Sequence, residues 1–183
     1  MKEELRARAA RIRLILMDVD GVLTDGKIYF LPGGEGALFE TKTFDTQDGL
    51  AFHWLHWAGI RTGVISGRSS AAVMERARQG HMTYVYQGHL EKLAILEEIL
   101  ADAKLSPEEI AYLGDDFTDV VIMKRVGLGV AVANAREEVK QMAHATTEAR
   151  GGSGALREVT EWVLKAQGRW PEILAKYGIK HGD

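Results

Sequence analysis

The amino-acid sequence predicts an α/β protein, built on a doubly wound, Rossmann-like parallel sheet with helices on both faces. Short apolar runs alternate with helical patterns along most of the chain, which is typical of parallel strands joined by crossover helices. Several of these runs end in a polar residue, at the carboxyl end where open α/β sheets bind their ligands. The 183 residues contain no repeat and no low-complexity tract, so we expect one domain over residues 1–183.

The first elements are a helix, a strand and a hairpin. The charged, Ala-rich segment 2–11 is expected to form a short amphipathic helix, and the apolar run 14–17 predicts a buried strand. Residues 27–44 then interrupt the α/β pattern, because two short runs flank the Gly-rich turn 31–36. This arrangement predicts a β-hairpin flap after the first strand.

After the hairpin the α/β alternation resumes and continues to the last helix. The Ser-Pro-Glu-Glu sequence at 106–109 carries the capping residues of a turn, and Gly-Gly-Ser-Gly at 151–154 separates the C-terminal helix and tail, about 155–183. The expected helices are 49–58, 70–79, 90–103, 117–125, 137–143 and 155–167, and the expected strands are 62–66, 83–86, 110–113 and 129–133.

Composition excludes several classes of function. The formal net charge is −3 with both signs interspersed, so no basic footprint indicates nucleic acid. The absence of Cys excludes a disulfide framework, a thiolate nucleophile and a Cys-ligated zinc, and is compatible with a reducing compartment. No apolar stretch reaches the ~20 residues of a transmembrane helix, and the N-terminus lacks the features of a signal peptide. We therefore expect a cytoplasmic protein without a membrane partner.

Two carboxylates directly follow the first predicted strand. Asp18 and Asp20 come after the apolar run 14–17 and before the turn at Gly21. Carboxylates this close repel each other unless a cation or a shared proton compensates, and hard oxygen ligands suit Mg²⁺. An Asp-Gly turn would account for Asp20, but it leaves Asp18 at a strand end without a reason. The pair therefore predicts a site for chemistry or metal binding.

Two other strand–helix junctions carry phosphate-binding candidates. Ser66 closes the strand 62–66 and can donate its hydroxyl to a phosphate oxygen beside the next helix, although Ser-Gly is also a common helix start. Lys92 stands in the first turn of the helix 90–103, where a cation opposes the helix dipole unless an anion is near. A solvated lysine is the alternative.

A fourth junction is acidic. Asp115, Asp116 and Asp119 place three acids within five residues after the strand 110–113, which costs repulsion unless cations are near. One of the three can cap the following helix. Together, the four junctions supply a nucleophile, an acid or base, a metal site and two phosphate donors.

In this order and spacing, the residues resemble the haloacid dehalogenase (HAD) superfamily of phosphotransferases over about residues 14–133. Residues 18–24, Ser66, Lys92 and residues 114–119 match its four motifs. The resemblance implies a HAD-like fold. Superfamily members carry a cap domain after the first motif or between the second and the third, but here these gaps hold only the hairpin and one βα unit. We therefore expect no cap domain.

Capless members with a DVDGVLTDG start, an ISGR second motif and a late Gly-Gly-x-Gly-Ala-Leu-Arg-Glu segment are the 3-deoxy-D-manno-octulosonate 8-phosphate (KDO 8-P) phosphatases, which this chain resembles. Residues 151–158 match the late segment, with Ser153 where Arg is common. A second departure is Gln47, where the family's Phe-Asn-x-Arg-Asp-Gly stretch carries Arg. The resemblance implies Mg²⁺-dependent hydrolysis of KDO 8-P in lipopolysaccharide biosynthesis.

The resemblance also implies a role for each motif residue. Asp18 is the expected nucleophile, which forms an aspartyl phosphate, and Asp20 is the expected general acid and base. Mg²⁺ is expected on the Asp18 carboxylate, the Asp20 backbone carbonyl and Asp115. By analogy with other metal sites, Asp116 is expected to support Asp115. The residues expected to bind the phosphate are Ser66 and Lys92.

Substrate contacts are expected from several residues outside the motifs. Arg68 and Arg76 could meet the sugar carboxylate, because Arg suits bidentate contact with a carboxylate, although Arg76 could instead be a solvated helix residue. His53 could approach the substrate or belong to a partly exposed helix face. The full set expected to bind the substrate is Asp20, Asp45, Thr46, Gln47, Asp48, Gly49, His53, Arg68, Arg76 and Lys92.

A capless site needs another cover, and the hairpin 27–44 could supply it. The resemblance implies a homotetramer with the hairpins at its centre and the C-terminal segment reaching a neighbour. Trp162 and Trp170 suit such contacts, yet core packing predicts similar residues. Two alternative functions stay open. One is hydrolysis of a nonulosonic (sialic-type) acid 9-phosphate, which Gln47 keeps possible, and the other is a non-catalytic assembly module.

Overall fold

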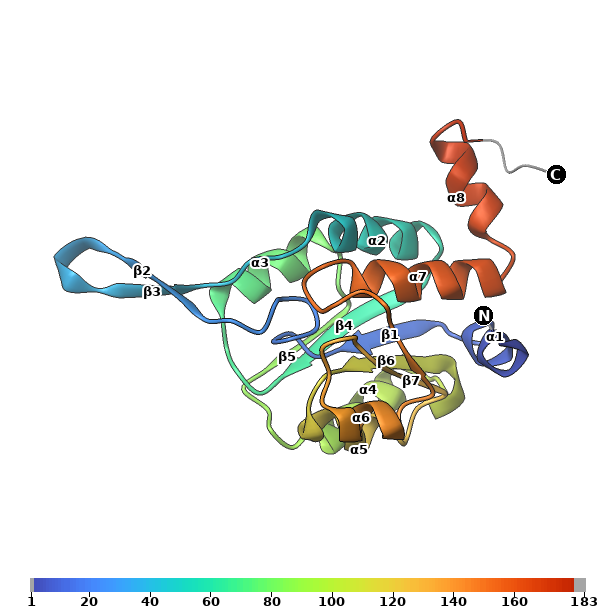
Figure 1. Ribbon diagram of the computed structural model, residues 1–183, viewed down its shortest axis with the longest axis horizontal. Helices are drawn as coiled ribbons and strands as arrows, with labels where there is room; N and C mark the ends of the chain where they lie inside the picture. The colour runs from blue at the N-terminus through green and yellow to red at the C-terminus, as the bar shows by residue number, and fades with distance from the viewer. Residues whose placement is uncertain (1, 180–183) are drawn as a thin grey trace.

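The computed structural model describes residues 2–179 and has six parallel strands at its centre (Figure 1). The strand order is β5-β4-β1-β6-β7-β8. The chain passes from β1 to β4 and β5 on one side, and then crosses over to β6 on the other, so the strand order reverses at β1. Ligands of open α/β sheets bind at the carboxyl ends of the strands beside such a reversal. The doubly wound parallel sheet predicted from the sequence is confirmed.

The strands are short and mostly buried. Their bounds are β1 (Leu14–Met17), β4 (Arg61–Ser66), β5 (Tyr84–Gln87), β6 (Ile110–Gly114), β7 (Leu128–Ala131) and β8 (Ala145–Thr146). β1 has the bounds predicted, and all four of its side chains lie in the core because both faces of a parallel sheet are covered by helices. β8 was missed, since two residues are too few to show a periodicity.

Helices cover both faces of the sheet (Figure 1). One face carries α2 (Thr46–Trp57), α3 (Ala71–Gln79) and α7 (Ala155–Ala166), and the other carries α4 (Lys92–Ala103), α5 (Val120–Met123) and α6 (Glu137–Met142). The remaining helices are α1 (Glu3–Ala9), α8 (Trp170–Lys176) and the 3-10 turns η1 (Gly34–Gly36), η2 (Pro107–Glu109) and η3 (Phe117–Asp119).

Two predicted helices differ from the structure at functionally relevant points. α2 begins three residues earlier than expected, because Oδ1 of Asp45 accepts hydrogen bonds from the N–H groups of Gln47 (2.6 Å) and Asp48 (3.2 Å) and caps the helix there. The helix expected over 117–125 is split into η3 and the short α5. α8 was not predicted as a separate helix. Residues 180–183 of the predicted C-terminal segment lie outside the described residues.

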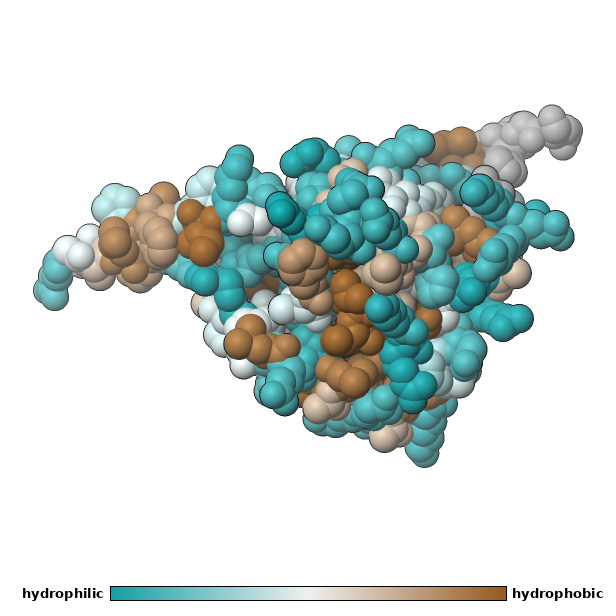
Figure 2. All heavy atoms as spheres, turned by 60° about the horizontal axis from the view of Figure 1, so that its bottom comes forward, coloured by the Kyte–Doolittle hydropathy of each residue, from teal (hydrophilic) through white to brown (hydrophobic). Residues whose placement is uncertain are grey.

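The hairpin consists of β2 (Tyr29–Pro32) and β3 (Leu38–Thr41), which pair antiparallel and project away from the sheet (Figure 1). Its paired part is shorter than the predicted 27–44. Apolar side chains gather on it, at the left of Figure 2, and the most exposed are 53–67% accessible: Phe30, Leu31, Leu38 and Phe39. No cap domain interrupts the described chain. None of the helices within residues 2–179 is long and apolar enough to cross a membrane.

Candidate active site

A cleft of about 210 Å³ opens at the carboxyl edge of the sheet, where the strand order reverses. Asp18 follows β1, and its N–H donates to the carbonyl of Leu113 (3.0 Å), which extends the β1–β6 ladder by one residue and fixes the direction of its side chain. The structure brings six of the predicted site residues to the lining of this cleft: Asp18, Asp20, Ser66, Arg68, Lys92 and Asp115.

Lys92 is buried at the floor of the cleft and faces two carboxylates. Its Nζ lies 3.1 Å from Oδ1 of Asp18 and 2.7 Å from Oδ1 of Asp119. Burial lowers the pKa of Lys92, but the charges of Asp119 and Asp18 outweigh burial and raise the pKa above its usual value. The ammonium is therefore charged. Because its side chain is buried, Lys92 is not the solvated lysine of the alternative interpretation.

Asp119 is fully buried and uses both carboxylate oxygens within the protein. Oδ1 accepts from the Tyr112 hydroxyl (2.7 Å) as well as from Lys92, and Oδ2 accepts from the backbone N–H groups of Asp115 (3.0 Å) and Asp116 (3.2 Å). Asp119 therefore holds the backbone that presents Asp115. Asp116 was expected to support Asp115. In the structure Asp119 does so, whereas the Asp116 side chain caps η3 by accepting from the N–H of Phe117.

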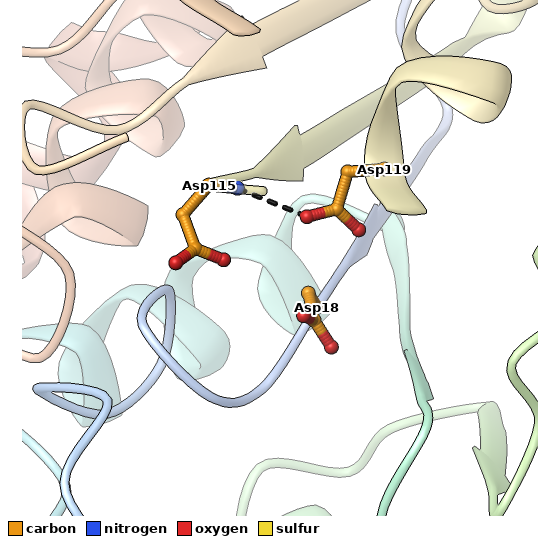
Figure 3. A group of neighbouring side chains, drawn as sticks. All are labelled: Asp18, Asp115 and Asp119. Carbon is orange, nitrogen blue, oxygen red and sulfur yellow. Dashed lines mark hydrogen bonds between the residues drawn. The ribbon is translucent and has the colours of Figure 1, made fainter. Parts of the chain in front are cut away.

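The carboxyl groups of Asp18, Asp115 and Asp119 lie around one space, with one oxygen of each within 4.8 Å of the others (Figure 3). Burial, then the charges of neighbouring acids, raise the pKa of Asp115 to about 7. Burial, then the charge of Asp119, raise the pKa of Asp18 to about 6, against the opposing effect of Lys92. A cation would relieve this repulsion, because it favours the charged form of both groups.

Asp115 has the free oxygen that a cation would need. Among the described residues, its Oδ1 is buried without a hydrogen-bond partner, whereas both oxygens of Asp119 are occupied. Hard carboxylate oxygens on Asp18 and Asp115 suit Mg²⁺, which binds through one or two carboxylates and completes its shell with water and phosphate oxygens. The residues present therefore fit Mg²⁺.

The turn after Asp18 is shaped by close packing. Gly21 has φ +91°, and a Cβ there would lie 2.1 Å from Oδ2 of Asp115, so only glycine allows Asp115 to approach this closely. Nδ2 of Asn134 donates to the carbonyl of Gly21 (2.9 Å), and the N–H of Gly151 donates to Oδ1 of Asn134 (2.6 Å). Asn134 thus joins the turn to the late Gly-rich segment. Sequence reasoning missed it, because a lone Asn carries no pattern.

Asp20 forms an ion pair that was also missed. Its Oδ1 accepts a hydrogen bond from Nζ of Lys42, which follows β3 at the base of the hairpin. Arg68 approaches Asp20 from the other side, with Nε 4.0 Å from Oδ2, and donates to Oε2 of Glu40 (2.7 Å). Nearby, Ser66 is buried and its Oγ accepts from the N–H of Arg68 (3.2 Å).

Two residues predicted to contact the substrate have partners within the protein. Asp48 is fully buried, and its Oδ1 accepts from the N–H of Arg157 (2.9 Å) at the start of α7, so its predicted contact with substrate is wrong. Arg76 is half-buried rather than solvated. It donates to the carbonyl of Asp45 (2.7 Å), and its guanidinium lies over the rings of Phe44 and Phe52.

The structure does not bring the other predicted contacts to the cleft lining. His53 is exposed on α2, and its ring faces that of His81, which follows α3 and precedes β5 at the amino edge of the sheet. His53 is not among the residues that line the cleft of its own chain, so its predicted contact with the substrate stays a prediction. The residues at the start of α2 also lie outside the lining: Asp45, Thr46, Gln47 and Gly49.

Comparisons with known proteins find one family model and several relatives that match this chain. The model of the haloacid dehalogenase-like hydrolase family matches residues 69–157. The chain is 41% identical to 3-deoxy-D-manno-octulosonate 8-phosphate phosphatase of Yersinia pestis over 165 residues, which cover 90% of this chain and 86% of the relative. The alignment therefore covers most of both chains.

Two solved structures are similar over nearly the full length. A probable YrbI family phosphatase of Pseudomonas syringae has a TM-score of 0.92 at 43% identity, covering 98% of this chain and 100% of the other. KDO 8-P phosphatase of Moraxella catarrhalis, solved with magnesium ion, phosphate ion and a KDO molecule, has a TM-score of 0.90 at 37% identity, covering 97% and 99%.

Proposed function

The chain belongs to the KDO 8-P phosphatase family of haloacid dehalogenase-like hydrolases, and we propose that it hydrolyses KDO 8-P to KDO and phosphate in lipopolysaccharide biosynthesis. One arrangement carries the proposal. Asp18 leaves the central strand beside the buried ammonium of Lys92, and Asp115 presents an unpartnered oxygen to the same space. Such an arrangement combines a nucleophile, a phosphate-binding cation and a metal ligand.

In the proposed reaction, a carboxylate oxygen of Asp18 attacks phosphorus. The bond between phosphorus and the sugar oxygen breaks, and the phosphoryl group remains on Asp18 as an aspartyl phosphate. Asp20 gives a proton to the departing sugar oxygen, and then takes one from the water that attacks the phosphoryl group. Asp18 is restored, and inorganic phosphate leaves.

The cleft stabilises charge on the group in transfer. Lys92 is held by Asp119 beside Asp18, so its ammonium can meet phosphoryl oxygens without rearranging. Ser66 can donate its hydroxyl to the same group from the end of β4. In phosphoryl transfer such positioning and electrostatic stabilisation provide most of the catalysis.

Mg²⁺ is the cofactor. The proposed ligands are the Asp18 and Asp115 carboxylates and the backbone carbonyl of Asp20. When bound, the ion neutralises charge on the phosphate and draws the Asp18 and Asp115 carboxyl groups into their ionised forms.

Arg68 is the proposed contact for the sugar carboxylate. It lines the cleft, and its side chain is about half exposed. In this structure it donates to Glu40, so a substrate carboxylate would take the place of the Glu40 carboxylate.

An assay of phosphate release tests the substrate. Purified enzyme with Mg²⁺ is given KDO 8-P, a nonulosonic acid 9-phosphate and arabinose 5-phosphate, and kcat/KM is compared. KDO 8-P should be the best of the three. A higher kcat/KM for the nonulosonic acid phosphate would contradict the proposal. The relatives named above are KDO 8-P phosphatases and do not favour that alternative.

We also propose a homotetramer in the cytoplasm. The exposed apolar side chains of the hairpin, including Phe30 and Phe39, would be covered by the hairpins of other copies. A substrate that carries phosphate and carboxylate charges crosses a bilayer poorly, so it would be consumed where it is made. Light scattering should give four chains, and Phe39→Glu should give a smaller species.

A further inference from the structure

Lys42 is buried although it belongs to the base of an exposed hairpin. Only 1% of its side chain is accessible. A buried ammonium is costly unless carboxylates compensate, and two do so: Oδ1 of Asp20 accepts its hydrogen bond, and Oε1 of Glu40 lies 3.6 Å from Nζ. The charge of Lys42 is therefore directed at the loop that follows β1.

Asp20 belongs to a ring of four charged groups of alternating sign. Lys42 contacts Asp20 and Glu40, and Arg68 contacts the same two carboxylates from the opposite side. The ring joins the hairpin, the loop after β1 and the loop after β4. Within it, the two oxygens of Asp20 differ, because Oδ1 accepts from Lys42 whereas Oδ2 is 4.0 Å from Nε of Arg68, too far for a hydrogen bond.

We propose that Lys42 is a positioning residue for Asp20, a step that rests on the function proposed above. Its ammonium holds Oδ1 and turns Oδ2 toward the departing sugar oxygen, so Oδ2 is the atom that exchanges the proton. Glu40 completes the device from the hairpin by holding Lys42, and before the substrate binds it also holds Arg68. The base of the hairpin thus sets the geometry of the general acid.

A structural role alone would not need the charge. Lys42→Met keeps the volume of the side chain and removes its charge. Removing one partner of a buried ion pair costs stability, but the Asp20 and Glu40 side chains are about one quarter exposed and Arg68 lies beside both, so we expect the variant to fold. A positioning role predicts a different result, because the effect then depends on whether the leaving group needs a proton.

The test compares two leaving groups in Lys42→Met. The rate of the first phosphoryl transfer at saturating substrate is measured by rapid quench with KDO 8-P, and by stopped flow with p-nitrophenyl phosphate. With the sugar phosphate the rate should fall about 100-fold, the scale of general acid catalysis. With p-nitrophenyl phosphate it should stay near the wild-type rate, because nitrophenolate departs without a proton.

Lys27→Met is the matched control. Lys27 lies at the start of the hairpin and pairs with Asp25 at 3.5 Å, but its side chain is exposed. Both rates should equal those of the wild type in this variant. Equal losses with the two substrates in Lys42→Met, or no loss with either, would overturn the proposal.

Two further arms keep the result interpretable. If Lys42→Met does not fold, Glu40→Gln removes the carboxylate that holds Lys42 and Arg68, and the sugar phosphate should again be affected more than the aryl phosphate. An equal effect on both would overturn the proposal. If the wild type hydrolyses arabinose 5-phosphate but not KDO 8-P, the proposed function fails, and arabinose 5-phosphate replaces KDO 8-P in the same comparison.

Discussion

Nζ of Lys92 lies 2.7 Å from Oδ1 of Asp119 at the buried floor of the cleft. Lys92 stands at the start of α4, which follows β5, and Asp119 lies in the turn after β6. Their contact therefore joins segments that follow strands on opposite sides of β1. Because Asp119 also accepts from the backbone N–H of Asp115, one carboxylate fixes both the cation beside Asp18 and the proposed metal ligand. The activity should therefore depend strongly on a residue that does not touch the substrate.

Asp119→Asn should lower kcat by about 100-fold, because Lys92 loses its charged anchor and preorganised donors contribute on this scale. Asp116→Asn is the comparison variant, since Asp116 is exposed at the start of the same turn, where its side chain caps η3 and lines the cleft. Steady-state kinetics and a melting curve for each variant check the prediction. A larger loss of kcat in Asp116→Asn would return the supporting role to Asp116.

Removing the metal should abolish activity. Excess EDTA should stop turnover and Mg²⁺ should restore it, whereas Ca²⁺ should not, because its larger and looser coordination misplaces the reacting oxygen. Asp115→Asn should weaken Mg²⁺ binding at least about tenfold in calorimetry. Asp20→Asn should bind Mg²⁺ normally, because its proposed ligand is a backbone carbonyl. Full turnover in the chelator would refute the metal assignment.

The stability of the protein should depend on the ionisation of Asp48. Burial raises the pKa of Asp48 to about 6 from its ordinary value of 3.8, so the fold favours the protonated form. Its contribution to stability is fully present below the unfolded-state value and is lost as the pH rises through 6. Asp48→Asn cannot ionise.

Relative to the wild type, the melting temperature of Asp48→Asn should be about 3–6 °C higher at pH 7.5, if about 1–2 kcal/mol is recovered. At pH 4 this advantage should vanish. Melting curves of both proteins across this pH range check the sign. A variant that is less stable than the wild type at pH 7.5 would mean that Asp48 is ionised and favourable in the fold.

Arg68 should determine the preference for an acidic sugar. KDO 8-P should exceed arabinose 5-phosphate, which lacks the carboxylate, by at least about 100-fold in kcat/KM, or roughly 2.7 kcal/mol. Arg68→Ala should remove most of this ratio while sparing small aryl phosphates. Arg78→Ala, an exposed helix residue paired with Glu75, should leave the ratio unchanged. Retention of the ratio in Arg68→Ala would assign the carboxylate to another residue.

Much of the fold could be predicted because the chain is locally consistent. The apolar run of β1 is short and is followed by a turn, which favours a buried strand, and the acids after it stand where a parallel sheet presents ligands. The motif residues therefore converge as expected: Asp18, Asp20, Ser66, Lys92 and Asp115. Such convergence follows from strand ends alone and needs no knowledge of side-chain packing.

The rest of the site depends on tertiary contacts that leave no local pattern. Lys42 reaches Asp20 from 22 residues away, and a lysine at the base of a hairpin looks solvated in sequence. Asp48 follows two polar residues and appears exposed, yet the approach of α7 buries it completely. Asn134 matters only because the turn at Gly21 and the late Gly-rich segment meet in space.

The phosphoenzyme tests the central claim most directly. Wild-type enzyme mixed with KDO 8-P and Mg²⁺ is quenched in acid within its first turnover, digested at low pH and analysed by mass spectrometry. One phosphoryl group should be found on the peptide that contains Asp18, and Asp18→Asn should show neither this adduct nor turnover. A phosphoryl group on any other residue, or full turnover by Asp18→Asn, would contradict the account.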